Sequence, residues 1–112
     1  MDMNKDEMLK KAASASFRKA NGAVLRTINI LREKYNKLDV VQSILEESGV
    51  EPGEFVDALN FLSMCGYIQL RDIVSKELAD IADASYKDCE AKVTAKGIRL
   101  LAGGISDNMV EV

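Results

Sequence analysis

The chain has 112 residues, which is enough for one domain with one hydrophobic core but not for two. Its 15 basic and 18 acidic residues leave a net charge of −3, and a hydrophobic content of 47% is ordinary for a globular domain. There is no histidine and there are only two cysteines, so the ligands of a structural zinc site and the Ser–His or Cys–His pair of a hydrolase are missing. We therefore expect no enzyme activity, no metal and no cofactor.

The hydrophobic residues are dispersed along the chain. No apolar run approaches the roughly 20 residues that cross a bilayer, and the opening MDMNKDEMLKK lacks the apolar stretch of a secretory signal. Cys65 and Cys89 are too few for a disulfide-stapled secreted scaffold. These features predict a cytoplasmic protein with free thiols and no membrane segment.

The first third of the chain is helical in composition. Residues 5–20 are rich in helix formers, and a second helical pattern runs over 23–35. Between them Asn21-Gly22 interrupts the pattern, and the sequence does not decide between one long helix and two helices jointed at Gly22. The apolar residues of the second segment recur on one face: Val24, Ile28, Leu31 and Tyr35.

Two shorter helices follow. Asp39 is a suitable N-cap for a helix over 40–47, and Gly49 suits the position just after its end. Pro52 fits the first turn of a third helix, which we expect to run to about Cys65.

After the third helix, the spacing of the apolar residues changes from that of a helix to that of a strand. Residues 67–73 alternate as a strand, 75–88 form a polar loop or turn, and 89–93 return as a second strand. Thr94 is a plausible N-cap for a last short helix. We expect 105–112 to be a mobile tail, with docking of Met109, Val110 or Val112 left open.

Two stretches in this order carry a family resemblance. FVDALNFLSMCGYIQL is similar to a recognition helix that passes through a glycine into a wing strand, and AKVTAKGIRLL is similar to the return strand and final helix. From about Val24 to Leu101 the chain resembles the winged helix-turn-helix domains of small bacterial and phage transcriptional regulators. The resemblance implies a mostly α, α+β fold with a three-helix core, a two-stranded wing, an extra N-terminal helix and a short C-terminal helix.

The resemblance also implies a domain organisation. Residues 1–20 would be an N-terminal helical extension, 21–104 the winged-helix domain, and 105–112 the tail. Such domains usually work as homodimers, often through an added terminal helix, and the extension fits that role. Phe17 lies outside the resembling region and is a candidate for packing between subunits.

A winged helix would bind duplex DNA with the third helix in the major groove and the wing on the backbone. Asn60 is the candidate base reader, because a carboxamide pairs with adenine N6 and N7. The candidate phosphate contacts are basic residues of the wing and of the N-terminal helices: Arg71, Lys76, Lys87, Arg18, Lys19 and Arg26.

The charge map argues against this function. Residues 38–70 contain six acidic residues and no Lys or Arg, whereas residues 1–37 carry a net charge of +5. Phosphate binding depends on Lys and Arg, so the predicted recognition helix would be repelled. Phe61 and Met64, expected on its solvent face, are better suited to a protein partner. The alternative is therefore a winged-helix adaptor that binds another protein and not DNA.

Overall fold

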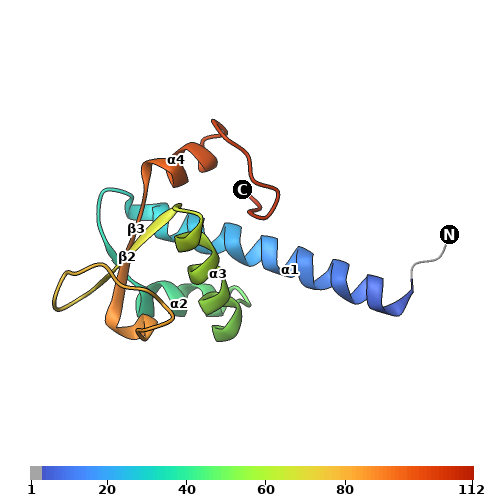
Figure 1. Cartoon of the computed structure of the whole chain (residues 1–112), viewed down its shortest axis with the longest axis horizontal. Helices are drawn as coiled ribbons and strands as arrows, with labels where there is room; N and C mark the ends of the chain where they lie inside the picture. The colour runs from blue at the N-terminus through green and yellow to red at the C-terminus, as the bar shows by residue number, and fades with distance from the viewer. Residues whose placement is uncertain (1–3) are drawn as a thin grey trace.

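A computed structural model describes residues 4–112; residues 1–3 of the expected extension lie outside the described range. Over that range the chain forms a mixed α+β fold of four α-helices, two short 3-10 helices and a three-stranded antiparallel sheet (Figure 1). The elements in chain order are α1 (Lys5–Ile28), η1 (Asn29–Leu31), β1 (Asn36–Lys37), α2 (Leu38–Glu47), α3 (Pro52–Met64), β2 (Ile68–Asp72), η2 (Tyr86–Asp88), β3 (Cys89–Val93) and α4 (Ala95–Leu101).

Helix α1 is continuous through Gly22, which answers the question that the sequence left open. It ends at Ile28, earlier than the predicted pattern, because the Asn36 amide donates to the backbone carbonyls of Ile28 and Leu31 and closes the helix end. Val24 and Ile28 are fully buried as predicted, but Leu31 is exposed. The apolar stripe therefore ends with the helix.

The sheet has the order β1-β3-β2, with β3 in the centre. The pairing Asn36↔Ala91 holds the first strand extended, so α2 starts directly after it at Leu38. Asp39 is consequently inside the first turn and is not the N-cap that we predicted. The strand β1 was not predicted, and the sheet has three strands where the sequence suggested two.

One hydrophobic core is shared by the helices, the sheet and the C-terminal tail. Figure 1 shows α2 and α3 on one side of α1, and α4 with the C-terminal tail on the other. Glycines with positive φ follow the ends of α2, α3 and α4 at Gly49, Gly66 and Gly103, and the one at Gly49 was predicted. The buried apolar side chains of this core include Val24, Leu25, Ile28, Leu38, Val41, Leu45, Phe55, Ala58, Leu59, Leu62, Ile68, Leu70, Ala91, Val93 and Leu100.

The N-terminal part of α1 projects from this body (Figure 1), and the molecule measures 54 × 30 × 25 Å. Residues 5–13 are all exposed, including the apolar Met8 and Leu9. This part of the helix gains little from tertiary packing, and isolated helices of this length are marginal in water.

The C-terminal tail lies against α1. Val110 is only 4% exposed, and the Asn21 amide donates to the backbone carbonyl of Met109 over 2.9 Å. The backbone N–H of Glu111 donates to the Arg18 carbonyl, and the Arg26 guanidinium donates to the Glu111 carbonyl. The segment that we expected to be mobile is thus held by backbone contacts, with Val110 as the docked side chain.

Gly22 makes this close approach possible. A Cβ atom at this position would lie 1.8 Å from the carbonyl oxygen of Glu111, so a larger side chain and the docked tail cannot coexist. Gly22 therefore allows the tail to pack against α1 and does not form a joint in the helix.

We expect Gly22→Ala to destabilise the fold by about 1–2 kcal/mol, because steric overlap with the tail outweighs the better helix propensity of alanine. Urea unfolding measures the change, and limited proteolysis should show faster cleavage of residues 105–112. Gly53→Ala in α3 is the matched control, since nothing lies within 4 Å of the added methyl group. Equal effects of the two substitutions would contradict the tail contact.

Candidate functional site

The outer face of α3 is the first candidate surface. The helix starts with a capping box in which Glu51 and Glu54 exchange side-chain and backbone bonds. The Ser16 hydroxyl on α1 donates to Glu54 over 2.9 Å, so this carboxylate is turned toward α1. The residues of α3 that remain exposed to solvent are Pro52, Gly53, Asp57, Asn60 and Met64.

Phe61 is not exposed, contrary to the prediction. It is half-buried against Phe17 of α1, with the ring centroids 5.1 Å apart in an edge-to-face arrangement. The expected Phe–Met surface pair is therefore reduced to Met64, which is 77% exposed. Phe17, which the sequence suggested for subunit packing, lies against α3 within one chain, and its role between subunits stays a prediction.

The predicted phosphate-binding cations of β2 and the β2–β3 loop are partly engaged in the structure. The Nε of Arg71 and the Nζ of Lys76 both donate to Glu90 Oε1, over 2.7 and 2.9 Å. The Arg71 guanidinium also lies 3.6 Å from the centroid of the Tyr35 ring. Because Glu90 is buried, these two cations neutralise it and are less free to bind phosphate than the sequence suggested.

The loop between β2 and β3, the segment predicted as a wing, is held by hydrogen bonds within the loop and to its two strands. Asp72 accepts bonds from the backbone N–H groups of Ser75 and Val74, which lowers the pKa of its carboxyl group. At the far end, Tyr86 packs edge-on against the buried Phe55, with centroids 5.2 Å apart. Lys87 follows it, is exposed, and forms no ion pair with any residue from 4 to 112.

The predicted basic residues of α1 do not join this surface. The backbone carbonyl of Arg18 accepts from the N–H of Glu111, and the Arg26 guanidinium donates to the Glu111 carbonyl. Lys19 and Arg26 also line a groove between α1 and the α2–α3 turn. The structure therefore divides the predicted cations between the β2–β3 hairpin and the flank of α1.

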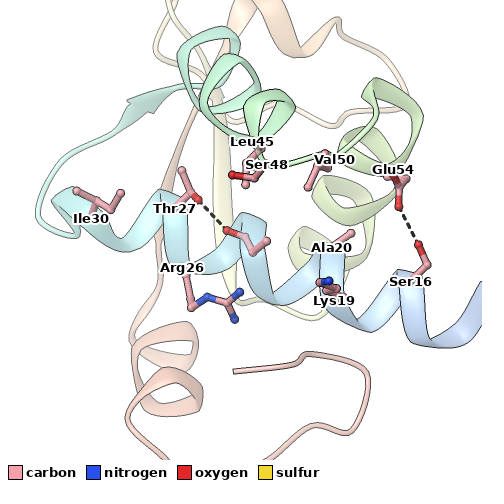
Figure 2. Close-up of a pocket in the computed structure, with 12 residues that line it drawn as sticks. Ser16, Lys19, Ala20, Arg26, Thr27, Ile30, Leu45, Ser48, Val50 and Glu54 are labelled. Atoms are coloured by element: carbon pink, nitrogen blue, oxygen red, sulfur yellow. Dashed lines mark hydrogen bonds between the residues drawn. The ribbon is translucent and has the colours of Figure 1, made fainter.

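The groove was not predicted from the sequence. Its volume is about 650 Å³, and Figure 2 shows α1 with Ala20 and Thr27 on one side and the turn with Leu45, Ser48 and Val50 on the other. The sequence holds no local signal for it, because its two walls come from segments about 25 residues apart. The lining residues are Ser16, Lys19, Ala20, Ala23, Arg26, Thr27, Ile30, Leu45, Ser48, Gly49, Val50 and Glu54.

The two cysteines and Tyr67 carry perturbed pKa values. Burial, with nearby carboxylates, raises the pKa of both thiols, at Cys65 and Cys89. Burial, together with a 2.6 Å hydrogen bond to Asp107, raises the pKa of Tyr67 to about 12. At neutral pH these groups are protonated, and the tyrosine hydroxyl donates to the start of the tail.

Within residues 4–112 no group of three potential metal ligands comes together, and none of the helices has the length and apolarity of a membrane span. Comparisons with protein-family models, with curated proteins and with solved structures gave no match to this chain.

We expect Phe17 and Phe61 to be energetically coupled within a single chain. A double-mutant cycle with Phe17→Ala and Phe61→Ala, measured by urea unfolding, should give a coupling of about 0.5–1.5 kcal/mol, the usual value for aromatic pairs. Met64→Ala should change stability by less than about 0.5 kcal/mol because its side chain is exposed. Additive effects of the two alanines would show that the ring contact is not formed in solution.

The buried carboxylate makes stability depend on pH. Burial alone would raise the pKa of Glu90, but hydrogen bonds and charges from Lys76 and Arg71 outweigh it and hold the pKa below its usual value of 4.5. Since the folded-state pKa is the lower one, this group adds stability above about pH 4.5 and loses it as the pH falls through the folded-state value.

Glu90→Gln should therefore cost about 1–2 kcal/mol at pH 7, and the cost should shrink as the pH falls from 4.5 through the lower folded-state pKa. Urea unfolding from pH 7 downward measures both effects, with Glu77→Gln at an exposed position of the β2–β3 loop as control. A difference between the wild type and Glu90→Gln that stays constant with pH would rule out the charged bridge.

Proposed function

We propose that this chain is a winged helix-turn-helix protein that binds duplex DNA and acts as a homodimer. The observation that supports this most is the sequence of elements: α2, a tight turn and α3 are followed directly by the antiparallel pair β2–β3 with its ordered loop. In a winged helix the second of these helices enters the major groove and the hairpin touches the backbone.

The orientation of Glu54 removes part of the electrostatic objection. With this carboxylate bonded to Ser16, Asp57 is the one acidic residue on the exposed side of α3. Asn60, on the same side, has a free carboxamide that suits adenine in the major groove. The outer face of the helix thus keeps the negative charge of Asp57 without a cation beside it, and it is less acidic than residues 38–70 as a whole.

Phosphate contacts have to come from other elements. Lys87 in the wing is exposed and without an ionic partner among the described residues, and Lys10 and Lys11 are exposed on the projecting part of α1. That projecting part, with Met8 and Leu9 on its surface, is the segment that we propose for contact with a second subunit. Phe17 packs against Phe61 within the chain, so the contact between subunits does not require it.

A second candidate function is an adaptor that binds a protein through α3. It is favoured by the 77% exposure of Met64 and by the bonding of Arg71 and Lys76 to Glu90, whose carboxylate compensates one of these two positive charges. In this case Met64→Ala would weaken the complex, whereas removal of the free lysines would have little effect.

Fluorescence anisotropy with a labelled duplex from the region upstream of the gene tests DNA binding. We expect binding that falls steeply with salt, and a loss of about 1–3 kcal/mol for Asn60→Ala. Asn108→Ala, an exposed asparagine in the tail, is the matched control. The absence of binding at low salt and tens of micromolar protein would contradict the proposal and favour the adaptor.

Lys87→Gln tests the phosphate contact separately. It should weaken binding to all duplexes alike and lower the slope of log K against log salt by about 1. Charge reversal at Arg71 and Lys76 is a poorer test, because it would leave the buried Glu90 without its cations and unsettle the fold itself.

A further inference from the structure

The groove between α1 and the α2–α3 turn has an apolar floor. Ala20 and Leu45 are at most 5% exposed, and Ala23 and Val50 are packed against the core next to them. Ile30 closes one end with an exposed side chain. A hydrophobic body of a few rings or a medium-length chain would be desolvated here.

One rim of this groove is cationic. Lys19 and Arg26 lie seven residues apart on α1, and Figure 2 shows them on the flank of the helix away from Leu45 and Val50. Neither side chain forms an ion pair with a residue between 4 and 112. The one carboxylate of the groove, on Glu54, already accepts bonds from Ser16 and from the Glu51 backbone.

We propose that this groove binds an amphipathic organic anion, with its apolar body on the alanine floor and its carboxylate or sulfonate at Lys19 and Arg26. Because the apolar floor and the cationic rim are separate parts of the groove, they fix the orientation of such a ligand. An anionic group at the Glu54 end would be repelled, whereas at the rim it gains charge-assisted hydrogen bonds. The ligand class follows from the groove and does not rest on DNA binding.

Arg26 connects this site to the C-terminal tail. Its guanidinium now donates to a neutral acceptor, the backbone carbonyl of Glu111. A ligand carboxylate or sulfonate is the stronger acceptor, because hydrogen bonds between charged groups exceed those to neutral carbonyls. Binding in the groove therefore draws Arg26 away from Glu111 and loosens the tail from Gly22.

The experiment uses two dyes with the same aromatic body, the anion 8-anilinonaphthalene-1-sulfonate and the neutral N-phenyl-1-naphthylamine, titrated into the whole chain by fluorescence. We expect saturable binding of the anion, weakened at least about tenfold by Lys19→Gln with Arg26→Gln. The control pair Arg32→Gln with Lys34→Gln removes the same charge from exposed positions outside the groove and should change binding by less than about twofold.

Ala23→Leu fills the floor and should weaken both dyes, with circular dichroism confirming that the variant is folded. Two results would overturn the proposal: equal weakening by the two charge pairs, or affinity for the anion that Ala23→Leu leaves unchanged. An anion that does not bind saturably at millimolar concentration would overturn it as well.

The coupling to the tail has its own readout. In ¹H–¹⁵N spectra the anion should shift the backbone amides of Ala23, Gly49 and Val50 in the groove and also those of Val110 and Glu111. The neutral dye should shift only the groove amides. Shifts from the anion that stop at the groove would overturn the coupling, and a failed DNA titration would not affect either result.

Discussion

Helix α1 contacts α2, α3, β3 and the C-terminal tail, and its unbroken course through Gly22 determines how those parts meet. One side buries Val24 and Ile28 in the core, and a second side receives the backbone of the tail at Gly22. A third side, with Ala20 and Ala23, forms the floor of the groove. A joint at Gly22 would separate these surfaces, so tail docking, groove and core packing all depend on one straight helix.

The sequence predicted the elements that are specified locally. The strand β3 has the predicted bounds. Thr94 caps α4 as predicted by accepting from the N–H of Gly97, because a hydroxyl at the N-cap satisfies a free backbone N–H of the first turn whatever the surrounding fold. The two-residue strand β1 escaped prediction, since pairing with β3 holds Asn36 extended and no periodicity accompanies so short a segment. The prediction of Asp39 as an N-cap was wrong for the same reason, because the pairing of β1 makes α2 begin earlier, at Leu38.

The candidate surfaces were less predictable because they depend on which elements meet. Periodicity placed Phe61 on the outside of α3 but could not show that Phe17 covers it from another helix. Asn21-Gly22 did carry a signal, although it marks a close backbone approach and not a break. Net charge by segment was informative only in part, since Glu54 is turned to Ser16 and Glu90 occupies Arg71 and Lys76.

The DNA-binding proposal depends on whether the exposed side of α3 meets the duplex. The most direct measurement is a ¹H–¹⁵N titration of the folded chain with an unlabelled duplex at low salt. The proposal predicts shifts at the amides of Gly53, Asn60 and Met64 on α3 and at Lys87 in the wing. A spectrum unchanged at equimolar duplex, or shifts that spare α3 and the wing, would contradict it.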